Sequence, residues 1–420
     1  MKSIEVAVTG LGLISSIGND EASVKESLLE LRHGIERFAF TNVPQSPVSV
    51  LGTIKEFETE SMDPEDWVYP KRYRLPRSIL RGLSPHGLYG HCALVQAIES
   101  AGLEEDAVSN PRTGLYSASV GSTWMVHGYL ERMHEVGVER TNPKGVVASV
   151  AGTLNFNLVA HFGIQGSSCG FTSACASSGH ALGFAFEEIV SGRQDRILVV
   201  GGEDGNADCI LPFAGMRALS VNPDPDTASR PFDRNRDGFV GTGGAVALIL
   251  ENRELAEKRD APIRAVFRGW GQSSDGYNPV LPEPEGKGLL RSMTEALRRA
   301  EVVPEAIDYV NAHAPSTPFG DVAEMKALKA LFGSGGNPGI SSTKALHGHG
   351  LSMGSILEAG ICVLSLENGF CPGSAHIEEL DPDAEGLTIL RKTEGNAPNL
   401  ALSNSSGFGG ANVSLVFAKA

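Results

Sequence analysis

The sequence contains two segments that repeat the same order of local patterns. Residues 93–120 join a helical pattern, the linker AGLEEDAV and the apolar stretch GLYSASVG, while residues 288–314 join a helical pattern, AEVVPEAI and DYVNAHA. Residues 238–250 and 407–417 each place a Gly-rich turn before an apolar stretch. The similarity is weak, and chance is the alternative explanation. Two copies of one α/β unit, joined near residues 252–262, would account for it and restrict the chain to a duplicated architecture.

Short β-branched stretches alternate with helical patterns along the chain, which is typical of α/β proteins. Residues 4–9 and 197–201 are predicted to form buried strands. Residues 176–190 place apolar side chains on one face of a predicted helix, and Gly192 follows as a stop signal. We therefore expect an α/β fold of two pseudo-repeated halves, residues 1–255 and 256–420.

The charge balance limits the partners of the protein. Lys+Arg number 35 and Asp+Glu number 50, which gives a net charge of −15 and argues against nucleic-acid binding. The 6 cysteines form no Cys-x-x-Cys pair, so a zinc ribbon or a disulfide scaffold is not indicated. Glu5 interrupts any signal-peptide core, and we expect a cytoplasmic protein without a membrane span. Residues 145–186 carry no Asp, Glu, Lys or Arg and are expected to be buried chain.

Three motifs point weakly to bound ligands. Gly10-Leu-Gly12 follows a predicted strand, as in a dinucleotide-binding turn, but the third glycine of that fingerprint is missing. Residues 233–238 begin like a calcium loop, yet its twelfth position is Gly244 instead of Glu. His347 and His349 have no Asp or Cys at metal-ligand spacing. We expect no bound metal or cofactor at these motifs.

Cys175 lies between a Gly/Ser-rich stretch, residues 166–172, and the helix predicted over residues 176–190. A thiol at a helix N-terminus is expected to have a lowered pKa, because the helix dipole and the free N–H groups stabilise the thiolate. The same N–H groups can stabilise the oxyanion that forms when a thioester carbonyl is attacked. The alternative is a small buried side chain, which is common for cysteine.

Two histidines strengthen the catalytic interpretation. His313 ends an apparent strand, and His349 lies in a Gly-rich turn before a predicted helix. Each one alone is typical of a surface or a core histidine. Cys175 and both histidines lie at loops that follow α/β elements, where catalytic residues are often placed.

Four segments carry a resemblance to a known family: TSACASSGHA (172–181), VNAHAPSTPFGD (310–321), SSTKALHGHG (341–350) and NSSGFGGAN (404–412). They resemble the signature segments of the β-ketoacyl-acyl-carrier-protein synthases, and residues 8–18 and 230–240 resemble family segments too. The resemblance spans essentially the whole chain in the family's order. It implies a thiolase-like fold of five layers, α-β-α-β-α. It also implies a dimer, formed with an identical chain or with a related ketosynthase-like subunit.

The resemblance implies roles for five residues. Cys175 would take an acyl chain from the phosphopantetheine thiol of an acyl carrier protein, with no separate bound cofactor. His313 and His349 would donate hydrogen bonds to the enolate that forms when a malonyl thioester loses carbon dioxide. Lys344 would bias the neighbouring histidines toward the neutral form, and Glu358 would be a buried structural carboxylate.

The resemblance also implies roles for the surrounding loops. The backbone N–H of Phe408 would complete an oxyanion hole with that of Cys175, and the Phe408 ring would gate the acyl pocket. Ser316 and Thr317 would bind the pantetheine arm, and Asp321 would organise their loop.

The chain departs from the family pattern at several positions. Pro315 replaces one of two threonines that bind the pantetheine arm in the family, so we expect altered arm binding. Ser406 stands where a Phe is common, which would widen the acyl channel. Gly243-Gly244 replaces a frequent Gly-Glu pair. These changes favour a specialised polyketide, polyene or unusual fatty-acid enzyme over a housekeeping one.

A short stretch of the chain is rich in basic side chains: Lys71, Arg72, Arg74, Arg77 and Arg81. The family places carrier-contacting residues in the corresponding segment, and acyl carrier proteins are acidic, so we expect this basic cluster to dock the carrier. The alternative is a solvated surface stretch or a dimer contact.

The leading interpretation is an active decarboxylating condensing enzyme that makes β-ketoacyl-acyl carrier protein. One alternative is a non-catalytic subunit like a chain-length factor, but such subunits lack the cysteine. A second is a thiolase or another coenzyme-A-dependent acyltransferase, which does not have the two-histidine pattern. A third is a structural or binding protein that has kept the fold.

Overall fold

The computed structural model describes residues 4–40, 43–333 and 337–420. Its main sheet has 10 strands in the order β10-β9-β11-β12-β8-β1-β7-β6-β4-β5. The strands of the first half are β1 (Val6–Ile14), β4 (Thr113–Ala118), β5 (Ser168–Phe171), β6 (Arg196–Glu203) and β7 (Gly244–Asn252). The strands of the second half are β8 (Ala265–Ser274), β9 (Tyr309–Asn311), β10 (Gly339–Ser341), β11 (Leu400–Gly407) and β12 (Ala411–Lys419).

The two halves of the sheet repeat one topology. In the first half β4 is parallel to β5 and β6, and β7 is antiparallel to β6 and β1. In the second half β9 is parallel to β10 and β11, and β12 is antiparallel to β11 and β8. The halves join through a short antiparallel pairing of Val6–Val8 in β1 with residues 265–267 in β8. The duplication expected from the sequence is therefore present in the strand order.

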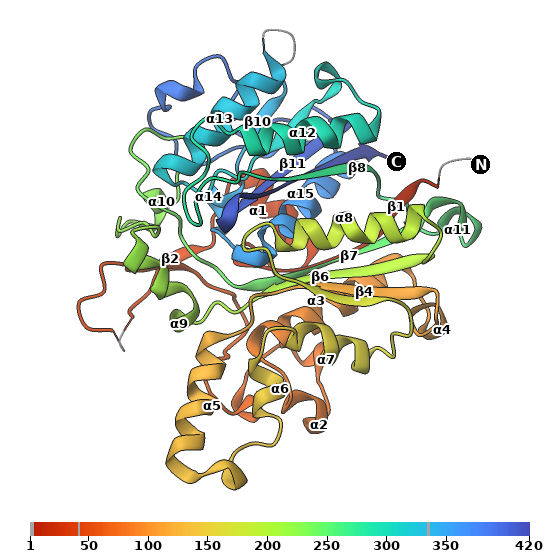
Figure 1. Cartoon of the computed structure of the whole chain (residues 1–420), viewed down its shortest axis with the longest axis vertical. Coiled ribbons are helices and arrows are strands. Elements are labelled where there is room, and N and C mark those ends of the chain that lie inside the picture. Colours follow the sequence, from red (N-terminus) through yellow and green to blue (C-terminus); the bar gives the residue numbers. More distant parts are fainter. Residues whose placement is uncertain (1–3, 41–42, 334–336) are drawn as a thin grey trace.

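Helices form three layers around the two halves of the sheet (Figure 1). The helices α3 (Pro85–Ala101) and α7 (Thr153–His161) cover the outer face of the first half, and α12 (Lys287–Ala300) and α13 (Pro318–Phe332) cover that of the second. Between the halves, α8 (Ser177–Val190) and α15 (Gly354–Asn368) contact each other and strands of both halves. This arrangement is the five-layer α-β-α-β-α fold that the resemblance implies.

The other elements connect or border these layers. The short strands β2 (Ile35–Arg37) and β3 (Val50–Gly52) form a separate sheet. The remaining α-helices are α1 (Glu21–Glu30), α2 (Arg77–Leu80), α4 (Glu105–Val108), α5 (Thr123–Val136), α6 (Gly145–Ser149), α9 (Ala207–Ile210), α10 (Pro225–Ala228), α11 (Arg253–Lys258) and α14 (Lys344–His347). The 3-10 turns are η1 (Pro64–Asp66), η2 (Lys71–Tyr73), η3 (Val138–Arg140), η4 (Leu211–Met216), η5 (Pro304–Ala306), η6 (Leu351–Met353), η7 (Pro382–Ala384) and η8 (Phe408–Gly410).

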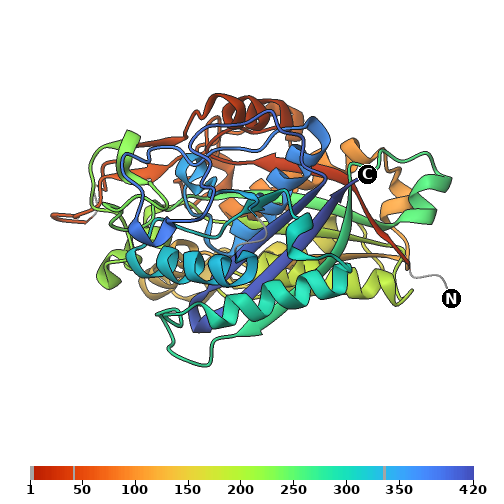
Figure 2. The ribbon, with the colours of Figure 1, turned by 90° about the horizontal axis from the view of Figure 1, so that it is seen from above.

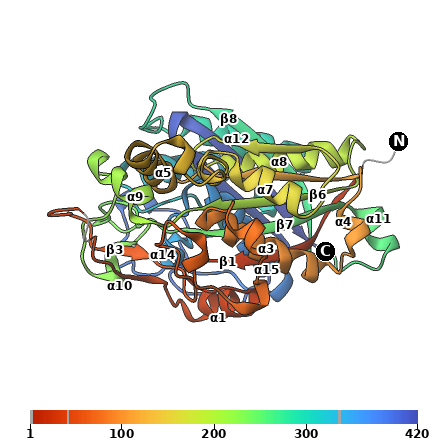
Figure 3. The same cartoon turned by 90° about the horizontal axis from the view of Figure 1, so that it is seen from below.

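Two further views separate the outer layers. From above, the green-teal helix α12 runs along the blue strands β11 and β12 of the second half (Figure 2). From below, α3 and α7 lie across the first half, with α1 at its rim (Figure 3). No helix in residues 4–40, 43–333 or 337–420 is long and apolar enough to cross a membrane.

Strands buried on both faces divide the apolar core into layers. In β7, Val246 and Leu248 face the central core with α8 and α15, whereas Ala247 and Ile249 face the outer core with α3. Successive strand side chains point to opposite faces, so an all-apolar strand supplies both cores at once.

The strand β1 extends beyond the predicted residues 4–9, because Gly10 and Gly12 continue it and form no ligand-binding turn. A Cβ atom at Gly12 would lie 1.9 Å from the carbonyl oxygen of Ala93, and one at Gly10 would lie 2.3 Å from that of Ala97. Both carbonyls belong to α3. The two glycines therefore allow this helix to lie directly against the strand.

The uncharged stretch 145–186 is less buried than we expected. Its strand β5 lies at one end of the main sheet with exposed side chains. Exposed apolar side chains occur in α6 and α7, with Val146 at 51% and Phe156 at 41% exposure. The prediction of buried chain holds for most of the apolar side chains of α8, although Phe184 is 39% exposed, and it is wrong for this edge of the single chain.

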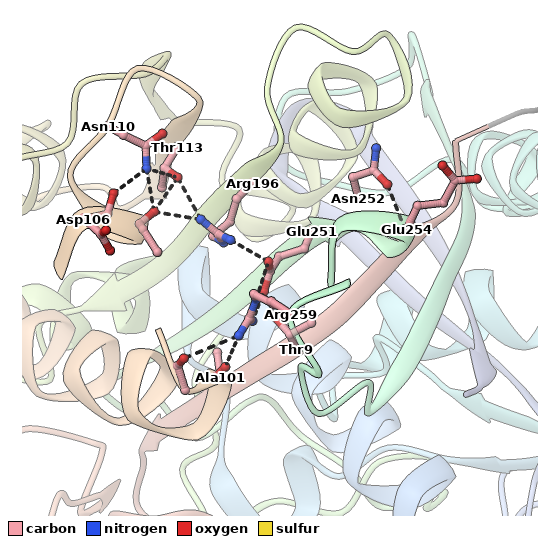
Figure 4. A network of polar contacts seen from close by, with 12 residues as sticks. Thr9, Ala101, Asp106, Asn110, Thr113, Arg196, Glu251, Asn252, Glu254 and Arg259 are labelled. Carbon is pink, nitrogen blue, oxygen red and sulfur yellow. Dashed lines mark hydrogen bonds and ion pairs between the residues drawn. The ribbon is translucent and has the colours of Figure 1, made fainter. Parts of the chain in front are cut away.

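A buried ion network lies where β1, β6 and β7 meet the end of α3 (Figure 4). Glu251 of β7 accepts hydrogen bonds from Thr9 (2.5 Å) and Arg196 (2.7 Å) and pairs with Arg259. Arg259 also donates to the carbonyl of Ala101 at 2.8 Å, at the end of α3. Burial would raise the pKa of Glu251, but the two guanidinium groups outweigh it and lower this pKa. The network joins β1, β6, β7 and α3.

The close approach of α3 to β1 can be tested by adding one methyl group. We expect Gly12→Ala to destabilise the protein by about 2 kcal/mol, because the new Cβ overlaps the helix backbone and forces it outward. Thermal unfolding would show this as a lower midpoint. Gly395→Ala is the matched control, since a Cβ there meets no atom within 4 Å. Equal midpoints for the two variants would contradict the packing described.

Candidate active site

Cys175 lies in a tight turn immediately before α8. Ala174 has a positive φ of 51°, which turns the chain so that Cys175 leads into the helix. The hydroxyl of Ser177 in the first turn of α8 accepts the N–H of Ser173 at 2.7 Å and donates to the carbonyl of Ala174 at 2.6 Å. These bonds hold the turn and keep the thiol at the helix N-terminus.

His349 reaches Cys175 from the second half of the chain. Its Nε2 lies 3.1 Å from the Cys175 Sγ. The His349 backbone N–H donates to the carbonyl of Val240 at 2.7 Å, and its carbonyl accepts the N–H of Thr242 at 3.2 Å. Both partners belong to the Gly-rich segment before β7, so the first half of the chain holds the histidine that faces its cysteine.

His313 completes the group at the end of β9. Its ring centroid is 5.4 Å from that of His349, with the planes 82° apart. Glu324 of α13 fixes this segment, since its carboxylate accepts the backbone N–H groups of His313 (3.0 Å) and Ala314 (2.6 Å). The Asn404 amide donates to the same carboxylate at 3.2 Å.

Lys344 and Glu358 form a fully buried ion pair behind the histidines. Lys344 begins α14, and Glu358 lies in α15. Burial raises the pKa of Glu358, whereas the ammonium group of Lys344 acts to lower it. The pair places one positive charge in the interior near His313 and His349.

Both histidines are neutral in this environment. Burial lowers the pKa of His313 and of His349 well below the usual value, and the charge of Lys344 lowers both further. The sequence-based expectation for Lys344 had the right direction, but burial is the larger cause. A neutral imidazole has one donor and one acceptor nitrogen, so each ring can accept or donate a proton.

The thiol of Cys175 does not have the lowered pKa that its helix position suggests. Burial raises the pKa of Cys175 to about 12, although Lys344 acts in the opposite direction. The expected thiolate is therefore wrong for the resting site, because burial of the charged form outweighs the helix N-terminus. The His349 Nε2 is the ring nitrogen at hydrogen-bond distance from this protonated sulfur.

The Phe408 loop passes directly against this turn. A Cβ at Gly407 would lie 2.8 Å from the Ser173 carbonyl oxygen and 3.0 Å from the Cys175 nitrogen. The loop is tied to residues 275–283, since Gly409 donates to the carbonyl of Pro279 at 2.7 Å. The Phe408 ring lies 6.1 Å from that of Phe213. The loop thus brings its backbone next to that of Cys175 and its ring to the cavity wall.

These groups line one cavity of about 390 Å³. Cys175, His313, His349 and Phe408 are in its wall. Apolar side chains at its rim remain exposed: Met216, Val280, Leu281 and Phe319. The cavity is suited to a substrate with an apolar chain and a reactive carbonyl near the sulfur.

The two residues expected to bind pantetheine differ in position. Thr317 lines the cavity, but Ser316 is fully buried and does not reach it. The Ser316 hydroxyl instead accepts the backbone N–H of Arg230 at 3.1 Å, because a positive φ of 76° turns this residue inward. The assignment of Ser316 to the pantetheine arm is therefore corrected.

Asp321 fixes the turn that carries Thr317. Its carboxylate accepts the backbone N–H groups of Thr317 at 3.0 Å and Phe232 at 3.1 Å. The guanidinium group of Arg236, only 7% exposed, lies 3.5 Å away and donates to the Thr317 carbonyl at 3.0 Å.

Two of the positions that depart from the family pattern lie in the same wall. Pro315 and Ser406 both line the cavity. The Ser406 hydroxyl bonds to the Asn412 side chain at 2.7 Å, and Asn412 donates to Asp275 at 2.7 Å. Gly243 and Gly244 lie at the start of β7, where a Cβ on Gly243 would be 2.4 Å from the nitrogen of Gly205. That contact leaves no room for a side chain at Gly243.

The weak ligand motifs have structural roles. The Asp233 carboxylate accepts the backbone N–H groups of Glu378 and Glu379 at 2.8 and 3.0 Å. His347 is buried and bonds to Thr343 at 3.1 Å, on a different turn from His349. Across the described residues, no three His, Cys, Asp or Glu side chains converge as metal ligands.

The basic cluster Lys71, Arg72, Arg74, Arg77 and Arg81 is exposed on η2 and α2. Arg77 and Arg81 pair with Glu65, and Arg72 lies 4.5 Å above the Tyr73 ring. The cluster lies away from the cavity wall, on the side of the first half (Figure 1). Arg81 also lines a surface groove in which basic side chains lie among acidic ones, such as Glu131 and Glu135.

Comparisons with known proteins agree with this site. The family model described as "Beta-ketoacyl synthase, N-terminal domain" matches residues 4–256, and "Beta-ketoacyl synthase, C-terminal domain" matches residues 264–378. The chain belongs to the β-ketoacyl synthase family.

Individual relatives cover the whole chain. The 3-oxoacyl-[acyl-carrier-protein] synthase 1 of Haemophilus influenzae is 39% identical, over 98% of both chains. The 3-oxoacyl-[acyl-carrier-protein] synthase 2 of Vibrio cholerae is 33% identical, over 99% of both. The solved β-ketoacyl synthase from Burkholderia phymatum superposes with a TM-score of 0.90 at 29% identity, covering 99% of this chain and 100% of that one. A solved ishigamide ketosynthase/chain length factor gives 0.88 at 27% identity, with full coverage of both.

In this β-ketoacyl synthase, the residues that hold the backbone of His313 and His349 were not predicted from the sequence. Glu324 follows Asp321 by three residues on α13, so the two carboxylates lie on one helix face. That spacing was a usable signal. Val240 acts through its carbonyl, and no property of its side chain could have indicated the contact with His349.

The buried ion pair of this synthase can be tested by a double-mutant cycle. We expect Lys344→Met and Glu358→Gln each to cost about 3 kcal/mol, because either change leaves one buried charge unpaired. The double variant should lose less than the sum. Urea denaturation of the four proteins measures these values.

The same pair predicts a pH dependence. In Lys344→Met, the pKa of Glu358 rises further in the folded state, so the unfolded chain releases this proton more readily. Stability should therefore fall as the pH rises from about 5 to about 8. A thermal midpoint that is flat over this range, or additive losses in the cycle, would contradict the pairing.

Proposed function

We propose that this protein condenses an acyl group on Cys175 with a malonyl unit on an acyl carrier protein to give β-ketoacyl-acyl carrier protein. The 3.1 Å contact between the His349 Nε2 and the Cys175 Sγ, with His313 in the same cavity, carries the proposal. The full-length similarity to 3-oxoacyl-[acyl-carrier-protein] synthases supports it. The substrates would arrive on phosphopantetheine, and no further cofactor is needed.

In the first half-reaction, the Cys175 sulfur forms a bond to the acyl carbonyl carbon, and the bond from that carbon to the carrier sulfur breaks. His349 accepts the thiol proton and returns it to the departing carrier sulfur, which leaves as a thiol. The backbone N–H groups of Cys175 and Phe408 would stabilise the oxyanion that forms between these steps.

In the second half-reaction, the malonyl thioester loses carbon dioxide, and the electron pair of the broken C–C bond forms an enolate. His313 and His349, both neutral, donate hydrogen bonds to the enolate oxygen. The enolate carbon then forms a bond to the acyl carbonyl carbon, the C–S bond to Cys175 breaks, and the released sulfur takes up a proton from solvent to return to the thiol. Lys344 and Glu358 act from behind the histidines, and Lys344 keeps both rings from taking up a proton before the reaction.

The arm of the carrier would enter between Thr317 and the Phe408 loop. Asp321 and Glu324 hold the backbone on which Thr317 and His313 lie, so arm and histidine keep a fixed separation. Pro315 supplies no hydroxyl to the arm, while Ser406 adds a polar group to the cavity wall. These differences favour a specialised polyketide, polyene or unusual fatty-acid substrate.

Two partner surfaces belong to the proposal. The basic cluster on η2 and α2 would dock the acidic carrier, although the whole chain has a net charge of −15. A second ketosynthase chain, identical or related, would cover the exposed edge strand β5 and the apolar side chains of α6 and α7. The division into halves at residues 1–255 and 256–420 is also part of the proposal.

The chain-length-factor alternative has less support, since the chain retains Cys175 in contact with His349 and has His313 in the same cavity. The same contacts disfavour a coenzyme-A-dependent thiolase and a purely structural protein.

Variants of the reactive residues test the reaction. We expect Cys175→Ala to form no acyl adduct by mass spectrometry and to give no condensation product. His313→Ala should still acylate Cys175 but lose roughly 100-fold or more in condensation, because an enolate donor is removed. His127→Ala, an exposed histidine on α5, is the control. Unchanged condensation by Cys175→Ala would refute the proposal.

Charge reversal tests the docking surface. We expect Arg77→Glu with Arg81→Glu to raise KM for the acyl carrier protein about tenfold and to leave kcat nearly unchanged, because the contact serves encounter rather than chemistry. A short pantetheine thioester should react as with the unaltered protein. Lys258→Glu on α11 makes the same kind of charge change away from the cluster. If it raises KM equally, the docking assignment fails.

A further inference from the structure

Glu203 is a buried carboxyl group that the mechanism above does not use. It ends β6 and is 0% exposed. One oxygen accepts the backbone N–H of Ser352 at 3.2 Å and also the Ser352 hydroxyl. The other oxygen is buried and has no hydrogen-bond partner among the residues that the structure describes, and no Lys or Arg of those residues pairs with it. A buried carboxyl oxygen without a hydrogen-bond partner is uncommon in folded proteins and needs a specific explanation.

Glu203 lies in the buried contact of β6 with α8 and η6, which adjoins Cys175 and which we call the seam. Ser352 follows His349 by three residues in η6, and Ser355 donates from its hydroxyl to the Cys175 carbonyl at 3.1 Å. The strand β6 packs against both α8 and η6. Glu203 therefore adjoins the two segments that carry the cysteine and its histidine. A negative charge on Glu203 raises the pKa of Cys175, in addition to the effect of burial.

The protonation of Glu203 is open to change near neutral pH. Burial raises its pKa to about 8, against the hydrogen bonds from Ser352, and the adjacent Asp204 raises it as well. From α3, His86 interacts with Asp204, and burial lowers the pKa of His86 to about 4, so its ring is neutral. From β7, the residue opposite Glu203 is Gly244, which has no side chain.

Two other charged groups act on the thiol. Lys344 lowers the pKa of Cys175, and Glu358 raises it. They form the buried ion pair described above, and their effect is the same whatever the state of Glu203. The histidines nearest the sulfur remain neutral throughout this range.

We propose that Glu203 is a positioning residue that controls the reactivity of Cys175: its neutral form permits the thiolate, and its ionised form opposes it. Two negative charges in one buried seam repel each other more strongly than they would in water. The deprotonation of Cys175 is thus coupled to the proton on Glu203. The inference rests on the proposed function only in taking Cys175 as the acyl acceptor.

Alkylation of Cys175 by iodoacetamide tests this without any acyl carrier. The rate at the Cys175-containing peptide would be followed by mass spectrometry from about pH 6 to about pH 9.5. We expect its logarithm to rise with pH and then to bend to a lower slope as Glu203 ionises, near pH 8. In Glu203→Gln the bend should be absent. The two rates should agree near the lowest pH and differ about tenfold at the highest, which corresponds to about one pKa unit at the thiol.

Two further variants make the test specific. Ser352→Ala removes a hydrogen bond that stabilises the ionised carboxylate, so the bend should move to higher pH. Glu104→Gln removes one exposed negative charge on the surface and should leave the profile unchanged. If Glu203→Gln fails to fold by thermal unfolding, the shift in Ser352→Ala decides the question.

Parallel profiles for the unaltered protein and Glu203→Gln would overturn the inference, and so would an unmoved bend in Ser352→Ala. Ionisation of Glu358 would bend the pH profile of the alkylation rate equally in all these proteins, so it does not affect the difference between them. If the protein failed to catalyse condensation, the alkylation result would still be valid, because alkylation measures the reactivity of the thiol itself. The two failures are therefore distinguishable.

Discussion

The site depends on hydrogen bonds that each half of the chain makes to the reactive segment of the other. The Val240 carbonyl holds the backbone of His349, and the Ser355 hydroxyl holds the carbonyl of Cys175. Neither reactive group is held by its own half alone. A histidine and a cysteine that are 174 residues apart can lie 3.1 Å from each other only if the two repeated units are docked rigidly. The buried layer of α8 and α15 provides that rigidity.

Burial sets the electrostatics of the site. It raises the pKa of the thiol and lowers those of both histidines, so the resting site is neutral at its centre. Lys344 is the positive charge that opposes the first effect and strengthens the second. In such a neutral site, a negative charge that develops during the reaction is stabilised by hydrogen-bond donors that are already oriented.

Two glycines allow backbone segments to pack closely against each other at positions on which the fold and the site depend. Gly12 lets α3 lie against β1, and Gly407 lets the Phe408 loop touch the turn before Cys175. At both positions the neighbour is backbone, which cannot yield as the end of a side chain can. The two glycines therefore allow close contacts between backbone segments that any side chain would prevent.

The repeated pattern and the motifs predicted the duplicated α/β plan, the family, and the three residues Cys175, His313 and His349 that the structure brings into one cavity, because each residue lies in a motif that its local residue types make recognisable. The sequence did not determine the inward turn of Ser316, the clamp of Glu324 on His313 or the place of Glu203 beside the cysteine. Nor did it give the direction of the Cys175 pKa, where a helix N-terminus suggested thiolate and burial favoured thiol. Only the tertiary structure decided these points, because desolvation and contacts between distant segments arise when the two halves close on each other.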